Sequence, residues 1–238
     1  MQTPKRVDAS HRPAIIHPAG SAWRQLSRPH WEDFFEQSIE AVFAGGGTIA
    51  DLGGGLRLDA TRGDKEDKAL VAKFGHHLKD PTVRYLVTDY TDQYHPDRVE
   101  DIHALTFNDG ELDGLFCMAV LEHVYDPKLA AEEITRVLKP GGTGLIYVPF
   151  MYRYHAVQTG DYYDYFRASK DGLAFLFRGC SQVTICPVRG LTETLLRFLP
   201  LHRLAPLVWL CRLLDWGSAG MRSVSELQTS GYFIRVVR

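Results

Sequence analysis

The sequence has few cysteines, and none of them stands in a recognisable motif. The four are Cys117, Cys180, Cys186 and Cys211, and no two have the spacing of a C-x-x-C pair. A zinc ribbon or a thioredoxin-like redox motif is therefore not indicated, and the sequence predicts no metal site. We expect buried free thiols, as is usual for a protein of a reducing cytoplasm.

The chain also lacks an excess of charge of either sign. It contains 27 Lys or Arg and 29 Asp or Glu among 238 residues, a formal net charge of −2. Nucleic-acid-binding proteins usually carry a basic excess or a basic stripe, so we expect no nucleic-acid partner. Residues 1–20 contain no apolar stretch of the secretory type, which favours a cytoplasmic location.

Long apolar runs are missing as well. The most apolar segment, residues 195–216, is interrupted by charged residues and prolines: Arg197, Pro200, Arg203, Pro206, Arg212 and Asp215. A membrane-spanning helix needs about 20 predominantly apolar residues, so this segment is not expected to cross a bilayer. We expect two short amphipathic helices within residues 191–218, which cover the sheet, form a homodimer face or rest on a membrane surface as a peripheral contact.

A short apolar segment ends on an acidic residue and three glycines. Residues 48–52 (TIADL) are followed by Gly53, Gly54 and Gly55. This pattern predicts a central strand of a parallel sheet, and the glycines permit a tight turn close to a ligand. A dinucleotide fingerprint is excluded because Leu58 stands where its third glycine belongs, and no Gly-Lys-Ser/Thr follows as in a P-loop.

Apolar segments alternate with segments of helical periodicity along most of the chain. We expect strands at residues 48–52, 83–88, 99–102, 114–120, 144–149 and 229–237, and helices at 23–43, within 58–80, at 126–139 and at 171–178. This order predicts an α/β fold with a doubly wound parallel sheet. We assign residues 1–22 to a flexible arm and residues 23–238 to one domain, with a core at 45–150 and a cap at 151–170.

Three further motifs follow the glycine loop in order. They are residues 100–107 (EDIHALTF), residues 121–124 (LEHV) and residues 136–142 (RVLKPGG). Over about residues 48–180 the chain resembles the class I methyltransferases that depend on S-adenosyl-L-methionine (SAM), in particular the type 11-like group with small-molecule acceptors. The resemblance implies a Rossmann-like, seven-stranded sheet, SAM as cofactor and methyl transfer as the activity.

The resemblance assigns the glycine loop to the methionine end of the cofactor. Asp51 would act on the methionine ammonium directly or through water, and Gly53 and Gly55 would let the loop lie against SAM. The family usually continues with a third small residue, where this chain has Arg57. Arg57 either points away or lies near the cofactor carboxylate as a charge-assisted donor.

The resemblance assigns the ribose and adenine to the ends of two other strands. Asp89 would accept both ribose hydroxyls, since an ionised carboxylate offers two acceptor oxygens. Asp101 would receive the adenine amino group, and Ile102 would pack on the ring.

Residues 151–166 are dense in tyrosine and follow the last expected strand of the core. A long aromatic insertion at that place favours a functional cap. Residues 149–156 and 164–169 resemble a methyltransferase subgroup associated with bacterial polysaccharide and glycan pathways. We select His155 as general base or acceptor-binding residue, with Tyr165 and Arg167 shaping the acceptor pocket. We also assign His123 to the substrate-binding residues, although the motif in which it stands favours a role in supporting a loop.

These residues together predict SAM-dependent methyl transfer to a small polar acceptor, most simply the O-methylation of a sugar or glycan precursor. Carbon methylation of a quinone-like or other apolar acceptor is the enzymatic alternative, suggested by the apolar C-terminal segment. A SAM-binding regulatory protein without turnover is the alternative from another class, and Arg57 is its main hint.

Overall fold

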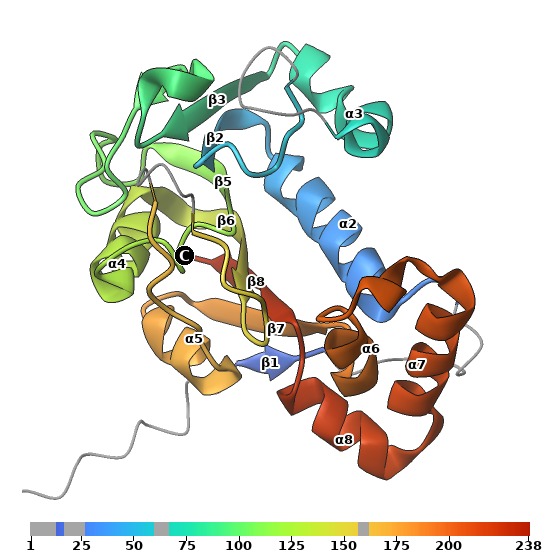
Figure 1. Cartoon of the computed structure of the whole chain (residues 1–238). Coiled ribbons are helices and arrows are strands. Elements are labelled where there is room, and N and C mark those ends of the chain that lie inside the picture. The colour runs from blue at the N-terminus through green and yellow to red at the C-terminus, as the bar shows by residue number, and fades with distance from the viewer. Residues whose placement is uncertain (1–12, 17–26, 60–66, 157–161) are drawn as a thin grey trace, which may run out of the picture.

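A computed structural model of the chain describes residues 13–16, 27–59, 67–156 and 162–238. Its centre is an eight-stranded sheet in the order β1-β7-β8-β6-β5-β2-β3-β4 (Figure 1). Strand β8 is antiparallel to both neighbours, and every other pairing is parallel. The strands are β1 Ala14–Ile15, β2 Gly47–Leu52, β3 Val83–Asp89, β4 Arg98–Val99, β5 Leu112–Met118, β6 Leu138–Pro149, β7 Gln182–Val188 and β8 Gly231–Val237. The predicted α/β class is confirmed.

The sheet has one strand more than the seven expected. Strand β1 lies within the segment expected as a flexible arm and pairs with β7, which the sequence analysis did not assign. Pro187 inside β7 argues locally against a strand, because proline cannot donate a ladder hydrogen bond. Strand β6 also begins earlier than expected, since residues 140–142 continue the strand rather than form a separate turn.

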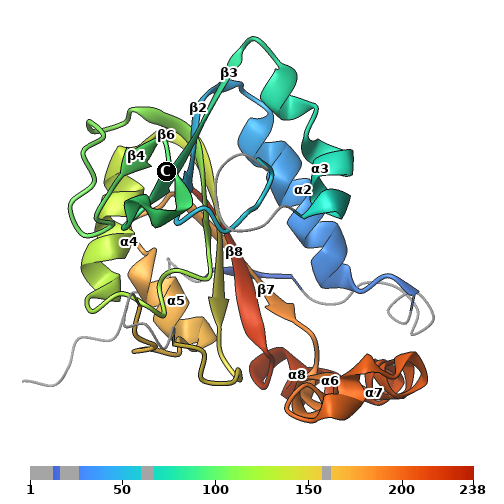
Figure 2. The same ribbon diagram turned by 45° about the horizontal axis from the view of Figure 1, so that its top comes forward.

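Two helices cover each face of the sheet (Figure 2). Helices α2 (His30–Phe43) and α3 (Lys68–Phe74) lie on one face, and α4 (Pro127–Val137) and α5 (Lys170–Leu176) on the other. Successive strand side chains point to opposite faces, so Phe116 packs with the α2 side and Leu115 with the α4 side. Asp126 caps α4 as its sequence predicts, accepting hydrogen bonds from the amides of Lys128 and Leu129.

A helical insertion joins β7 to β8. It contains α6 (Leu191–Leu196), the 3-10 turn η4 (Pro200–Arg203), α7 (Ala205–Gly217) and α8 (Ala219–Leu227), which gather next to β7 and β8 (Figures 1 and 2). Helices α6 and α7 lie within residues 191–218, where two helices were expected, and α8 follows them. The buried carboxylate of Asp215 on α7 accepts hydrogen bonds from the amides of Thr192 (2.7 Å) and Glu193 (3.0 Å) and from the hydroxyl of Ser225 (3.0 Å). One carboxylate therefore holds all three helices together.

The insertion leaves many large apolar side chains exposed. Trp209 is 57% exposed, and exposed leucines surround it in sequence: Leu195, Leu199, Leu201, Leu204, Leu210, Leu213 and Leu214. Among the described residues, none of the helices is both long and apolar enough to cross a membrane. Patches of this kind mark contact surfaces more often than chance exposure.

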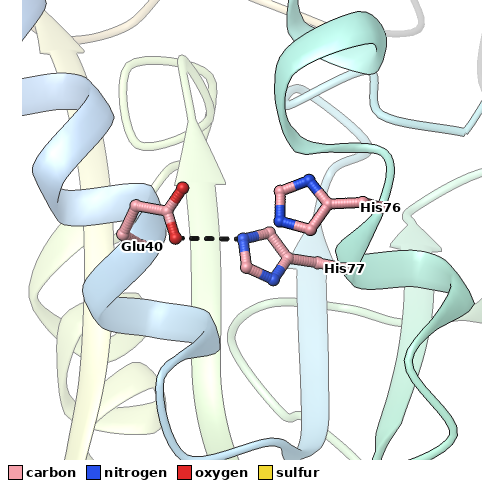
Figure 3. Close-up of side chains that lie close together, drawn as sticks. All are labelled: Glu40, His76 and His77. Atoms are coloured by element: carbon pink, nitrogen blue, oxygen red, sulfur yellow. Dashed lines mark hydrogen bonds and ion pairs between the residues drawn. The ribbon is translucent and has the colours of Figure 1, made fainter.

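A cluster of histidines lies where α3 and the 3-10 turn η2 (His77–Lys79) meet α2. His77 Nε2 is 3.1 Å from Glu40 Oε2, and the His77 ring stacks on Phe43 with centroids 4.4 Å apart. His76 lies beside it (Figure 3). These contacts tie helices on one face of the sheet, and none of the three polar residues lines either pocket described below.

Asp215→Ala is expected to lower the free energy of unfolding by about 3 kcal/mol, because two helix amides and a hydroxyl lose their buried acceptor. Urea unfolding followed by circular dichroism measures the change. Asp171→Ala removes a carboxylate whose side chain is 92% exposed and serves as control, with an expected change below about 0.5 kcal/mol. Equal stability of the two variants would contradict the assigned role of Asp215.

Candidate functional site

The carboxyl ends of β2, β3 and β5 meet at one edge of the sheet. Leu52, at the end of β2, is in register with Thr88 on β3 and Cys117 on β5. The loops that follow these strands, together with the cap, line a pocket of about 770 Å³. We refer to it as the edge pocket. Ligands of open α/β sheets bind at this edge.

The glycine loop lies against the end of β5. Gly53 has φ +82°, and a Cβ at this position would lie 2.6 Å from Cγ2 of Val120. A Cβ on Gly55 would lie 2.4 Å from the carbonyl oxygen of Met118. The glycines thus admit a close approach to a neighbouring loop and still line the edge pocket.

Asp51 lies beneath this loop and does not line the edge pocket. It is fully buried, and its Oδ2 accepts hydrogen bonds of 3.0 Å from the Leu56 amide and from the Tyr85 hydroxyl. Burial raises the pKa of Asp51 to about 7, because a low-dielectric site disfavours the charged carboxylate. Its other oxygen, Oδ1, accepts no hydrogen bond from the described residues. Asp51 therefore anchors the loop in this structure, and its direct or water-mediated contact with the methionine ammonium stays a prediction.

Asp89 stands at the end of β3 and lines the edge pocket. Its Oδ1 accepts a hydrogen bond of 3.1 Å from the Thr91 amide. Partial burial raises its pKa above the ordinary value for an aspartate. The carboxylate is therefore anchored on one side and borders the pocket, as a diol-binding residue must.

Asp101 and Ile102 line the same pocket after β4. Burial acts to raise the pKa of Asp101, but hydrogen bonds from the His103 amide (2.9 Å) and Nδ1 (2.7 Å) outweigh it and lower that pKa. Glu100 faces inward and accepts hydrogen bonds from the Thr106 amide and hydroxyl. Glu100 fixes the loop, and Asp101 and Ile102 are presented to the pocket.

The tyrosine-rich cap is joined to the loop after β5. The main-chain oxygen of Glu122 accepts hydrogen bonds from the amides of Tyr165 (2.8 Å) and Phe166 (3.2 Å). His123 Nδ1 is 2.7 Å from the carbonyl oxygen of Tyr163. His123, Tyr163 and Tyr165 all line the edge pocket, so the cap closes it on the side of β5.

His155 lines the edge pocket from within the cap. Its Nε2 lies 3.5 Å from Oε1 of the buried Glu122, and its Nδ1 lies 3.1 Å from the carbonyl oxygen of Arg153. The Glu122 carboxylate raises the pKa of His155 above its ordinary value, while burial acts in the opposite direction. A histidine in this state can take up a proton and keep it against a fixed anion.

Arg167 does not line the edge pocket. Its guanidinium pairs with Asp164, with one bond of 2.6 Å, and donates to the carbonyl oxygens of Phe166 and Arg153. The pair lowers the pKa of Asp164 to about 2, and Asp164 in turn accepts a hydrogen bond from the His155 amide. Arg167 therefore holds the cap in shape from behind the pocket wall, and its influence on the acceptor pocket stays a prediction.

A second cavity of about 610 Å³ adjoins the first. We refer to it as the insertion pocket, because Arg197, Phe198 and His202 of the β7–β8 insertion help to line it. Both pockets share five residues: Arg57, Met118, Ala119, Tyr147 and His155. The backbone at Arg57 (φ +61°) and Ala119 (φ +58°) is left-handed, a strained state that is typical of functional sites.

Sequence reasoning assigned no role to Glu122. Both of its carboxylate oxygens are buried and accept no hydrogen bond from the described residues. Ligand atoms of Glu122, His123 and His155 lie within 4.8 Å of one another. The available signal was the pair Glu122 and His123 directly after an apolar strand. Nothing in the local sequence indicates that His155, 32 positions after His123, lies next to this pair.

Comparison with protein families gives one match. Residues 67–146 match the family described as a methyltransferase domain. These residues carry a methyltransferase domain, which bears out the predicted enzyme class and the cofactor SAM. The edge pocket contains the loops that the family resemblance assigned to SAM. No curated protein matches the chain.

Solved structures are similar to this chain at low sequence identity. A SAM-dependent methyltransferase from Archaeoglobus fulgidus has a TM-score of 0.53 and 14% identity, with 92% of this chain and 95% of that chain covered. Phosphoethanolamine N-methyltransferase 2 of Haemonchus contortus, in complex with phosphomonomethylethanolamine and S-adenosylhomocysteine, has a TM-score of 0.48 and 13% identity. That likeness covers 91% of this chain, which spans 56% of the Haemonchus chain.

Gly55→Ala is expected to destabilise the protein by about 1–3 kcal/mol and to weaken binding of S-adenosylhomocysteine, because the added methyl group would collide with the Met118 carbonyl oxygen. Calorimetry and thermal unfolding measure the two effects. Gly45→Ala is the matched control, since no atom lies within 4 Å of its added Cβ. Unchanged binding in Gly55→Ala would show that the loop does not need this close approach.

Proposed function

We propose that this methyltransferase transfers the methyl group of SAM to a hydroxyl of a small polar acceptor, such as a sugar or glycan precursor. The observation that carries the proposal is the position of His155. This histidine borders both pockets and faces the buried carboxylate of Glu122. A proton-accepting group between a cofactor pocket and a second cavity is what a hydroxyl acceptor requires.

In this proposal the edge pocket holds SAM. Asp89 accepts the ribose hydroxyls, Asp101 receives the adenine amino group and Ile102 packs on the ring. Gly53 and Gly55 leave room for the cofactor, and Asp51 acts through the loop that it anchors. The assignment of SAM to this pocket is supported by the carboxylates of Asp89 and Asp101, which line the same pocket as the glycine loop.

SAM supplies a methyl group that is already activated on a sulfonium, so the chain's own residues mainly position the acceptor and exclude water. The Nδ1–H of His155 donates to the Arg153 carbonyl, which leaves Nε2 to accept a proton. Neutral His155 takes the hydroxyl proton at Nε2 as the new bond forms. The Glu122 carboxylate then stabilises the imidazolium. Tyr163 and Tyr165 cover this region of the edge pocket.

Asp89→Ala is expected to weaken binding of S-adenosylhomocysteine about 10- to 100-fold, because a paired hydrogen bond to a charged group contributes roughly 1.5–3 kcal/mol. Asp51→Ala should also weaken it, through loss of the loop anchor. Isothermal calorimetry measures both. Asp92→Ala, which changes an exposed neighbour of Asp89, is the control. Wild-type affinity in folded Asp89→Ala and Asp51→Ala proteins would rule out the proposed cofactor contacts.

His155→Ala is expected to lower kcat by about 10²–10⁴-fold while the affinity for SAM stays unchanged. Because the base must be neutral, kcat of the wild type should rise with pH through the raised pKa of His155. Glu122→Gln removes the largest of the contributions that raise this pKa, while those of Arg153 and Asp164 stay, so the acid limb should move to lower pH. The pH profile of kcat, with EDTA-treated enzyme as a check for metal dependence, measures this.

The alternatives make different predictions for the same variants. Full turnover of His155→Ala across the pH range would favour carbon methylation, in which no hydroxyl proton is removed. Tight SAM binding without turnover on any acceptor would favour the regulatory alternative. The homodimer, the peripheral membrane contact and the cytoplasmic location stay predictions from sequence. Exposed Trp209 and its neighbouring leucines are the surface that the first two would use.

A further inference from the structure

The insertion pocket has an unusual charge content. Four arginines line it, and they come from distant parts of the chain: Arg57, Arg153, Arg189 and Arg197. Two carboxylates also line it, those of Asp67 and Glu122. Asp67 caps α3 through the amides of Ala69 and Leu70, and Glu122 faces two histidines.

Behind the pocket wall, one carboxylate serves three guanidinium groups. Glu193 Oε1 lies 3.5 Å from Arg189 Nε and 3.5 Å from Arg197 Nη2, and its Oε2 lies 3.0 Å from Arg212 Nε. Arg212 also interacts with Glu32, but among the described residues Glu193 is the one carboxylate in an ion pair with Arg189 and Arg197, and one negative charge cannot neutralise both. The wall formed by Arg189 and Arg197 therefore keeps a positive excess that faces the cavity.

The two arginines are also incompletely hydrogen-bonded. The Nε atoms of Arg189 and Arg197 are buried and have no hydrogen-bond acceptor among the described residues. Arg189 has a left-handed backbone, φ +67°, and its Nη1 donates to Ser230 at 3.0 Å. Burial lowers the pKa of Arg189 below its ordinary value, as expected for a cation with too little compensating charge. Such a strained and underpaired cation is costly without a ligand.

We propose that the insertion pocket binds a phosphate group of the methyl acceptor, with Arg189 and Arg197 as the main ligands and Arg153 at the rim. This inference rests on the proposed function. Guanidinium groups donate paired hydrogen bonds that match the oxygens of a phosphate. A doubly charged phosphate suits the several cations better than a carboxylate does. Because His155 borders both cavities, an anchored phosphate would hold a hydroxyl of the same molecule at the base.

The proposal names an acceptor class, a phosphorylated sugar or a related phosphate ester. The cavity also contains apolar and aromatic side chains, among them Trp31 and Phe198. A sugar ring packs well on such surfaces while its phosphate pairs with the arginines. A neutral sugar would leave the arginines unpaired and should bind much more weakly.

The test uses the full chain saturated with S-adenosylhomocysteine, so that the cofactor site cannot take up the probe. Calorimetry with glucose 1-phosphate, glucuronate and glucose compares a phosphate, a carboxylate and a neutral sugar. We expect glucose 1-phosphate to bind at least tenfold more tightly than glucuronate, and glucose to show no binding. Equal affinity for all three sugars, or a preference for glucuronate, would overturn the phosphate assignment.

Variants then locate the site. Arg197→Gln and Arg153→Gln should each weaken glucose 1-phosphate binding at least fivefold, and they are preferred to changes at the buried Arg189. Arg178→Gln removes a cation that stacks on Phe175 and lines neither pocket, and it should bind like the wild type. Unchanged affinity in both Arg197→Gln and Arg153→Gln would overturn the proposal. Failure of S-adenosylhomocysteine to bind would count against the proposed function instead, so the two failures are distinguishable.

Discussion

The site depends on one buried acid, Glu122. Its main chain accepts two hydrogen bonds from the cap, and its carboxylate lies between the imidazoles of His123 and His155. A carboxylate without exposed surface requires compensating charge, and the two imidazoles beside it come from the loop after β5 and from the cap. The need to satisfy this acid therefore holds the cap over the edge pocket. Glu122 also raises the pKa of His155, the histidine that lines the insertion pocket.

Much of the core could be predicted from sequence because its signals are local. The glycines after residue 52 and the Asp-Pro pair at residues 126–127 are each interpretable within a few positions, and the structure has a tight loop and a capped helix there. Asp89 and Asp101 could be predicted as pocket residues because each stands at the end of an apolar segment that was expected to form a strand. Parallel strands bring such ends to one edge, so their shared pocket is a consequence of fold class alone.

What could not be predicted depends on which of several available partners a side chain or strand contacts. Asp51 has the sequence context of a ligand-binding acid, and nothing in that context indicates that its Oδ2 accepts hydrogen bonds from Leu56 and Tyr85. Arg167 stands beside the pocket residues in sequence, but Asp164, three positions away, pairs with its guanidinium. Strand β7 contains a proline, and β1 is only two residues long, so pairing across the sheet rather than propensity determines both.

The helical insertion enters after β7 and leaves before β8, two strands that are hydrogen-bonded neighbours, with Val188 paired to Gly231. Its two ends therefore lie side by side, and the ladder between β7 and β8 fixes them independently of what connects them. Closing a longer or shorter connection between fixed ends changes the chain entropy only slowly with length. The insertion can consequently diverge in sequence and size while the register of the sheet and the loops around the cofactor stay constant. The part of the insertion pocket that the insertion lines can thus change in shape without disturbing the strand ends and loops that form the edge pocket.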